Sequence, residues 1–215
     1  MLLVNLLRSA ALTLLLLLVV YLPAFLVVAS LHLSVDAMVP AVIAITLVLA
    51  CVLMGLAVHR GWLAPADFGW RWPRYPYLFY ALLFGAPLSL LIALIQIHAG
   101  ESGELVGMHL TPWQLYLCFG LGAPVQEEAI FRGLLQSTLA RSLGTWARLA
   151  AHGLLASLAV ALLFGALHLK VGRFTAAGAL VLGVLAGELK RRSGSLLPSM
   201  VCHALFNLGG LLLVV

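Results

Sequence analysis

Long runs of apolar residues, separated by short polar stretches, make up most of this chain. The first five runs are each at least about 20 residues long, the length that a helix needs to cross the hydrocarbon core of a bilayer. The pattern therefore predicts an all-α, polytopic transmembrane helix bundle of about seven to eight spans. The predicted spans are residues 10–33, 37–58, 77–99, 113–139, 150–169, 174–189 and 196–215.

The composition indicates that lipid, rather than water, covers the surface of the bundle. Hydrophobic residues make up 64% of the chain and charged residues only 9%, whereas soluble domains contain about 25% charged residues. The net charge of +5 does not indicate a nucleic-acid partner, because the basic residues lie in short loops where positive charge sets topology. Cys51, Cys118 and Cys202 are isolated within apolar runs and indicate neither a disulfide framework nor a zinc knuckle.

The distribution of basic residues predicts the orientation of the chain. With the N-terminus in the cytoplasm, the acidic loop containing Glu101 and Glu104 lies outside, and only Lys170 and Arg173 oppose the positive-inside rule. The sequence therefore predicts a multi-pass protein of the plasma (inner) membrane, with its N-terminus in the cytoplasm. The residues that then lie inside are Arg8, Arg60, Arg71, Arg74, Arg141, Arg148, Lys190, Arg191 and Arg192.

The chain is predicted to divide at about residue 76. Residues 1–76 comprise two N-terminal spans and a segment in which Trp and Tyr alternate with Arg and Pro, a mixture typical of the headgroup interface. Residues 77–215 contain the remaining spans.

Three charged residues lie inside the fourth apolar run, in the sequence Gln-Glu-Glu-Ala-Ile-Phe-Arg-Gly. Each would cost about 2.5–3.5 kcal/mol if it faced lipid, so we expect them to face the bundle interior or a wet cavity. Glu128 and Arg132 are four residues apart and share a helix face, so we expect them to pair. Glu127 is rotated by about 100° from Glu128 and lacks a cation at its own i+4 position. An unpaired carboxylate in apolar surroundings has a raised proton affinity, which suits acid–base chemistry.

Further polar residues lie in two later runs. The fifth run places His168 one turn after Phe164, and the seventh places His203 and Asn207 one turn apart on one face. If the three helices converge, a carboxylate and two imidazoles could activate a water molecule, and the amide could stabilise an oxyanion.

Together these positions resemble the CPBP family of intramembrane proteases, also described as CAAX prenyl endopeptidases or Abi and bacteriocin-processing proteins. The resemblance rests on Glu127-Glu128-x-x-x-Arg132, Phe164-x-x-x-His168 and His203-x-x-x-Asn207, and covers residues 111–215. It implies a catalytic set of Glu127, Glu128, Arg132, His168, His203 and Asn207 in a cavity between helices. Glu127 and His168 would activate water, Glu128 and Arg132 would form a structural pair, and His203 and Asn207 would steady the oxyanion.

The sequence leaves the role of metal open. Glu127, His168 and His203 could be three ligands of one zinc ion with an open fourth position. The HExxH signature is absent, however, and we favour direct activation of water by the glutamate.

If the helices follow the predicted spans, the site residues lie at different depths in the membrane. Counting from the cytoplasmic side puts His203 about 10 Å deep, Glu127 about 18 Å and His168 about 27 Å. We therefore expect the fifth helix to start later, near residue 157, or to tilt strongly, and we expect the site to open to the cytoplasm.

The favoured function is an intramembrane endopeptidase that cuts a membrane-associated or prenylated CAAX-type peptide. One alternative is a non-catalytic scaffold or bacteriocin self-immunity protein that binds a membrane partner through the same cavity. A proton-coupled transporter is a third possibility, but the chain shows no internal repeat of the kind expected for one.

Overall fold

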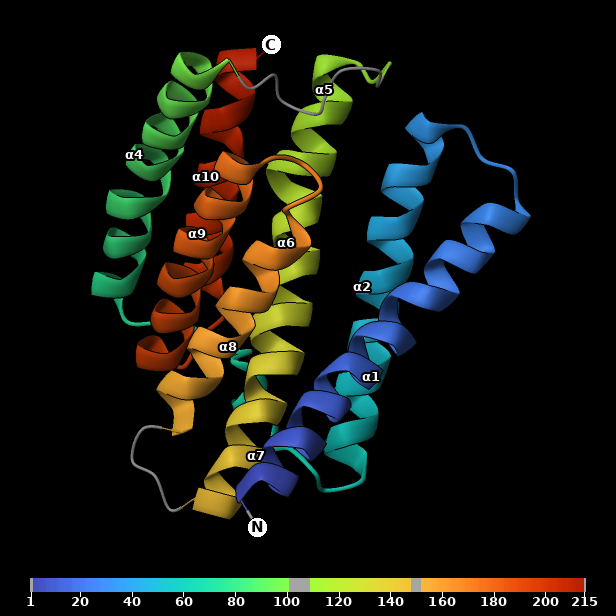
Figure 1. Ribbon diagram of the computed structural model, residues 1–215, viewed down its shortest axis with the longest axis vertical. Coiled ribbons are helices and arrows are strands. Elements are labelled where there is room, and N and C mark those ends of the chain that lie inside the picture. Colours follow the sequence, from blue (N-terminus) through green and yellow to red (C-terminus); the bar gives the residue numbers. More distant parts are fainter. Residues whose placement is uncertain (1, 101–108, 148–151, 215) are drawn as a thin grey trace.

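The computed structural model describes residues 2–100, 109–147 and 152–214, and within these ranges it contains helices and no strand (Figure 1). The predicted fold class, an all-α membrane helix bundle, is confirmed. The expectations for Glu101, Glu104 and Arg148 lie outside the described residues.

Each predicted apolar run corresponds to one helical stretch. By length and composition, three helices of the described chain could cross a membrane, namely Leu7–Ser30, Val35–His59 and Tyr75–Ala99, and His152–Leu167 and Leu197–Leu212 are shorter apolar helices. The elements are α1 (Leu2–Ser30), α2 (Val35–His59), α3 (Pro65–Phe68), α4 (Tyr75–Ala99), α5 (Pro112–Leu115), the π-helix η1 (Tyr116–Gly122), α6 (Ala123–Glu128), the π-helix η2 (Ala129–Gln136), α7 (Ser137–Ala147), α8 (His152–Leu167), α9 (Arg173–Ser193) and α10 (Leu197–Val214).

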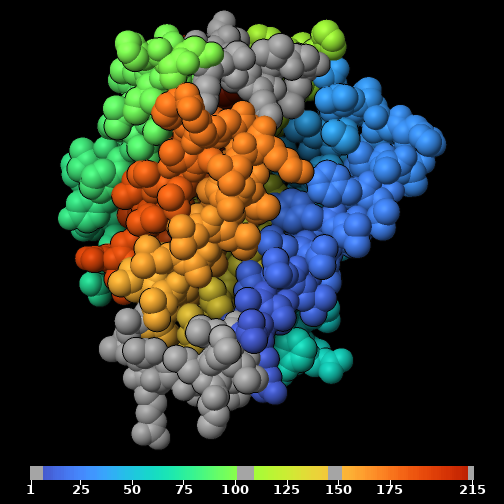
Figure 2. All heavy atoms as spheres, viewed as in Figure 1, coloured from blue at the N-terminus to red at the C-terminus, as the bar shows by residue number. Residues whose placement is uncertain are grey.

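The bundle is assembled around α10 and the long stretch from α5 to α7. Helix α10 packs against α4, α9, η1 and α6, and α8 packs against α9, α7 and η2. Helices α1 and α2 pair with each other and contact this core through α7, η1, α6 and η2. Figure 2 shows the α1–α2 pair, in blue, as one flank of the molecule. In Figure 1 the pair leans away from the other helices at the end opposite the N-terminus.

The short segment α3 and its flanks close the end of the bundle near the N-terminus. Phe68 is buried there, and the Arg71 Nε donates a hydrogen bond of 2.8 Å to the Gly194 carbonyl. Lys190 Nζ reaches the Asp67 carbonyl at 2.9 Å and Ser137 Oγ at 2.8 Å. Aromatic side chains around α3 remain exposed, as an interfacial segment requires: Trp62, Trp70, Trp72 and Tyr75.

Glycines of α9 allow close approach of the neighbouring helices. A Cβ on Gly183 would lie 3.0 Å from the Cα of Ala161 in α8, and one on Gly187 would collide with the Ser157 hydroxyl. The same two glycines expose carbonyls that accept hydrogen bonds from Arg132 Nη2, at 3.3 Å, and Gln136 Nε2, at 3.1 Å. The absence of a side chain at these two positions therefore permits the close packing of α8 against α9.

We expect Gly183→Leu to destabilise the protein by at least about 1–3 kcal/mol, because the added side chain overpacks the α8–α9 contact. The measurement is the melting temperature in detergent, together with the monodisperse fraction in size-exclusion chromatography. Gly55→Leu is the matched control, since a Cβ on Gly55 meets nothing within 4 Å. Equal behaviour of the two variants would show that the α8–α9 contact does not limit stability.

The fourth helical stretch is longer than predicted, and this removes the disagreement in depth. It continues to Ala147 instead of ending at 139, whereas α8 begins at His152, so the expected start near residue 157 is wrong. Ser157 and Gln136 both face Gly187 and therefore lie at one level. From that level, Glu127 is about 14 Å along its helix (136 − 127 residues) and His168 about 17 Å along its own (168 − 157 residues). Glu127 and His168 thus reach similar depth.

Candidate active site

The two glutamates lie in α6, which is flanked by π-helical segments on both sides. In η1 the Ala123 N–H bonds to the Cys118 carbonyl, five residues earlier, as in a π-helix. In the same pattern, the N–H of residue 124 would bond to the Phe119 carbonyl. Residue 124 is a proline, which has no N–H, so the Phe119 carbonyl has no backbone donor within the helix. The Asn207 Nδ2 donates to it at 2.8 Å. A local break in the backbone ladder therefore holds Asn207 in place, and π-segments often occur at functional sites for this kind of reason.

Glu128 and Arg132 form the predicted pair in the interior of the bundle. Arg132 Nη1 lies 3.0 Å from Glu128 Oε1, and both side chains are 0% exposed. The guanidinium also lies over the Phe164 ring, 4.7 Å from its centroid. A buried charge is tolerated only when it is paired and hydrogen-bonded, so each member of this pair depends on the other.

His203 lies between the two glutamates. Its Nδ1 is 2.8 Å from Glu128 Oε1, and its Nε2 is 3.6 Å from Glu127 Oε2. Because Glu128 is an acceptor, Nδ1 must carry the proton of this hydrogen bond, and the imidazole is held with Nε2 toward Glu127. The arrangement follows the logic of catalytic triads, in which a buried carboxylate sets the orientation of a histidine.

Glu127 occupies a different environment from its neighbour. Its side chain is 22% exposed and has no lysine or arginine partner among the described residues, in contrast to the fully buried Glu128. Glu127 borders a cavity, while Glu128 and Arg132 lie behind it. The structure therefore separates the two adjacent carboxylates as the helical geometry of the sequence predicts.

His168 follows the last turn of α8 and borders the same cavity. Its Nδ1 is 2.8 Å from the Phe164 carbonyl, which is an acceptor only, so Nδ1 is the donor. In the neutral ring, Nε2 then has a free lone pair and can accept a proton. The ring also packs on Phe164, with centroids 4.6 Å apart.

The cavity has a volume of about 570 Å³, within the range of small-molecule and peptide-side-chain sites. Glu127, His168, His203 and Asn207 all border it, so the structure brings together residues from α6, α10 and the end of α8. With Ser89 and Gln96 of α4 as polar exceptions, the residues that α2 and α4 contribute are mostly apolar and include Val39, Val42, Ile43, Ile92, Ala93 and Ile97.

Two polar residues of the site were missed by the sequence analysis. Gln126 Nε2 donates a hydrogen bond of 3.1 Å to the Tyr21 hydroxyl, and both residues border the cavity beside Glu127. Gln126 could have been noticed, because it is a buried polar residue in the same apolar run. Tyr21 gave no signal, because a lone tyrosine in the first apolar run has no sequence relation to residues about a hundred positions later.

The proposed zinc ligands do not form a ligand set in this geometry. Among the residues that the structure describes, no three His, Cys, Asp or Glu side chains are close enough to share one metal ion. Glu127 and His203 approach each other, but His168 does not complete a group with them.

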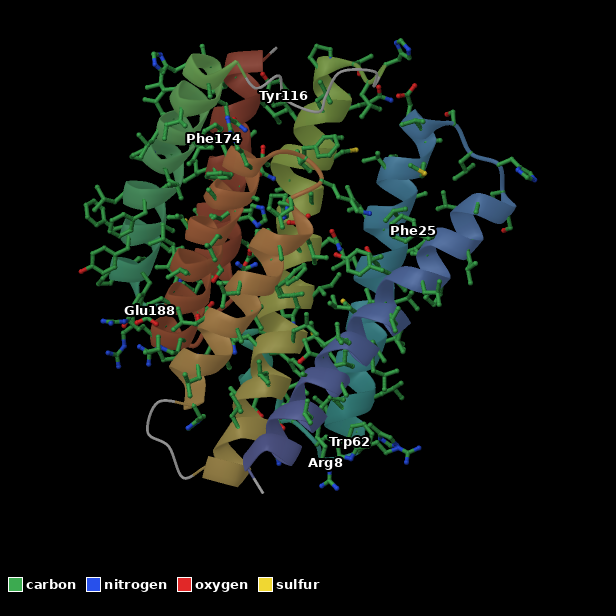
Figure 3. All side chains as sticks on the ribbon, viewed as in Figure 1. Arg8, Phe25, Trp62, Tyr116, Phe174 and Glu188 are labelled. Atoms are coloured by element: carbon green, nitrogen blue, oxygen red, sulfur yellow. The ribbon has the colours of Figure 1, made fainter. Side chains whose placement is uncertain are left out.

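The position of the cavity conflicts with two expectations taken together, a cytoplasmic N-terminus and a site that opens to the cytoplasm. The bordering residues extend from Glu127 to Met38 at the start of α2 and Ile97 at the end of α4, away from the N-terminus. Figure 3 shows Arg8 at one end of the molecule and Tyr116 and Phe174 toward the other. A cytoplasmic N-terminus and a cavity that opens to the cytoplasm are therefore incompatible, and one of these expectations is wrong.

The comparisons with known proteins agree with the resemblance found in the sequence. Residues 109–209 match a family model described as type II CAAX prenyl endopeptidase Rce1-like. This segment contains all six predicted site residues and runs from the turn before α5 into α10. No curated protein and no solved structure gives a match. Through residues 109–209, the chain is similar to the Rce1-like family of type II CAAX prenyl endopeptidases.

Proposed function

We propose that this protein is an intramembrane endopeptidase in which Glu127 activates a water molecule for attack on a peptide bond. The observation that carries the proposal is the contrast between the two adjacent glutamates. Glu128 is sealed in an ion pair, whereas Glu127 faces a cavity with His203 Nε2 3.6 Å away. A scaffold protein would need neither a free carboxylate nor an oriented imidazole at this depth.

The proposed reaction uses the polar residues that border the cavity. The Glu127 carboxylate takes a proton from water while the oxygen of that water attacks the scissile carbonyl, and His168 Nε2 offers a second proton acceptor. The carbonyl becomes a tetrahedral oxyanion, which the Asn207 amide stabilises with the N–H that does not bind Phe119. Glu127 then returns the proton to the leaving amine as the C–N bond breaks.

Glu128 and Arg132 act on this reaction through His203. The ion pair holds Glu128 in place, and Glu128 holds the His203 ring with Nε2 toward Glu127. When Nε2 carries a proton, it can donate to Glu127 or to the oxyanion. The pair is therefore a positioning element and does not contact the substrate.

The test is cleavage by purified protein in liposomes, using quenched peptides and a digest of membrane proteins. We expect His168→Ala to lower kcat about 10²–10⁴-fold, because a proton acceptor is removed from the cavity. His98→Ala is the matched control, since His98 lies exposed at the end of α4 and should leave the rate unchanged. A strong chelator should leave wild-type cleavage intact.

Two results would contradict this proposal. Loss of wild-type cleavage in chelator would assign the activation of water to a metal ion. Absence of cleavage for wild type on every substrate would favour a scaffold or immunity protein that uses the same cavity to bind a membrane partner.

A further inference from the structure

Most basic residues of the described chain gather at one end of the bundle. Arg141 Nη1 lies 3.7 Å from Asp67 Oδ2, and Lys190 also contacts the Asp67 backbone. Arg71 bonds to the turn between α9 and α10, and Arg60 and Arg141 border one shared crevice. The Ser9–Ser142 hydrogen bond, 2.6 Å long, places the start of α1 and therefore Arg8 at the same end. This basic end also carries the exposed tryptophans around α3.

The opposite end carries little positive charge. Lys170 lies in the turn before α9, Arg173 is the first residue of α9, and Asp36 accepts a hydrogen bond of 3.0 Å from the backbone of His109. Basic residues in short loops are retained on the cytoplasmic side during insertion. By this rule the basic end faces the cytoplasm, and the turns that follow α1 and α4 face the other side of the membrane.

The cavity extends from the catalytic groups toward that other side. Its upper border includes Met38 in the first turn of α2, Ile97 in the last turn of α4 and Thr175 in the first turn of α9. Toward the cytoplasm, the space below Glu127 is filled by the Glu128–Arg132 pair and by buried Phe131 and Leu134. The described residues thus close the site on the basic side.

We propose that the cavity opens to the non-cytoplasmic half of the membrane and takes an internal, apolar, uncharged stretch of a membrane-anchored or exported peptide. The substrate part of this inference rests on the proposed protease function. Of the two incompatible expectations, the cytoplasmic N-terminus is kept and the cytoplasmic opening is abandoned.

The chemistry of the border supports this class of substrate. No lysine or arginine occurs among the described residues that border the cavity. A free C-terminal carboxylate, such as the end of a CAAX sequence, would need a cation or several N–H donors there. The apolar walls from α2 and α4 instead suit hydrophobic side chains, and the Asn207 amide and the histidines suit a peptide group.

Cysteine accessibility in right-side-out membrane vesicles tests the sidedness without any use of activity. Cys51, Cys118 and Cys202 are replaced by alanine, and single cysteines are introduced as Ile97→Cys at the cavity border and Arg74→Cys at the basic end. Both parent residues are exposed. We expect a membrane-impermeant maleimide to label Ile97→Cys in intact vesicles and Arg74→Cys only after permeabilisation. The reverse pattern, or equal labelling of both in intact vesicles, would overturn the proposal.

A second measurement does not depend on the cysteine-free background. An epitope tag placed after α10 should be bound by antibody in intact vesicles, because α10 runs from the turn at Ser195 toward the same end as the cavity border. Binding only after permeabilisation would overturn the proposed sidedness.

The substrate class is tested with pairs of quenched apolar peptides that differ only in a free or amidated C-terminus. Amidation should leave kcat/KM nearly unchanged, whereas loss of a charge-assisted hydrogen bond would lower it about 10-fold or more. A strict requirement for the free carboxylate would overturn the substrate class while the labelling result stands. If no peptide is cleaved, the protease function fails, and the labelling result still decides where the cavity opens.

Discussion

Replacement of Glu127 by glutamine is expected to abolish hydrolysis while the protein remains folded. The amide cannot take a proton from water, and loss of a general base typically lowers kcat about 10²–10⁴-fold. Glu127 is partly exposed in the cavity and makes no ion pair with Arg132, so the neutral isostere leaves no buried charge without a partner. The measurement is kcat in liposomes, with the melting temperature of the same preparation.

Glu188→Gln provides the matched control, because it makes the same chemical change outside the cavity. Glu188 pairs with Arg191 and Arg192 on the surface of α9, at a site where ion pairs contribute little. We expect this variant to keep full activity. If Glu127→Gln retained activity, or if its melting temperature fell as far as that of a core variant, Glu127 would not be the base.

Replacement of Arg132 by alanine is expected to cost about 3–5 kcal/mol of folding free energy, because it leaves the Glu128 carboxylate buried without its cation. The guanidinium also contacts the Gly183 carbonyl and the Phe164 ring, and these contacts would be lost together. We expect a sharp fall in the yield of monodisperse protein and in the melting temperature. Any folded fraction should also be less active, since Glu128 positions His203.

Arg141→Ala separates the effect of burial from the effect of losing an arginine. Arg141 lies 3.7 Å from Asp67 with a side chain that is 53% exposed, so its removal should cost no more than about 1 kcal/mol. Similar melting temperatures for the two variants would show that the Glu128–Arg132 pair contributes no more to stability than an exposed ion pair.

The local parts of the site could be predicted because they follow from the geometry of one helix. Glu128 and Arg132 pair at the i, i+4 spacing, Glu127 faces another direction, and the Phe164 ring contacts His168 one turn later. Each relation depends on residues within a few positions, and helical periodicity determines which of them share a face. The membrane class could also be predicted directly, because apolar runs of about 20 residues have the length and composition of transmembrane helices.

Features that depend on how far each helix extends beyond its apolar run were predicted wrongly from the sequence. The fourth stretch was predicted to end at 139, but it continues to Ala147 as an amphipathic helix that α1 and α8 cover. Hydropathy marks only the part that lies in lipid, so depths counted from its limits placed His168 too far from Glu127. Ser157 and Gln136 lie at the same level because both contact Gly187. This relation between helices cannot be read from the sequence of either segment alone.

The sequence by itself thus determined the fold class, the six motif residues and the division of the two glutamates, since all three depend on composition or on spacing within one helix. Only the tertiary structure decided that His203 lies between the glutamates, that Asn207 binds the carbonyl freed by Pro124, and that Tyr21 joins the site through Gln126. It also decided which end of the bundle the cavity faces. Those relations join residues from separate helices, whose tilt and height are set by packing rather than by the pattern within any one of them.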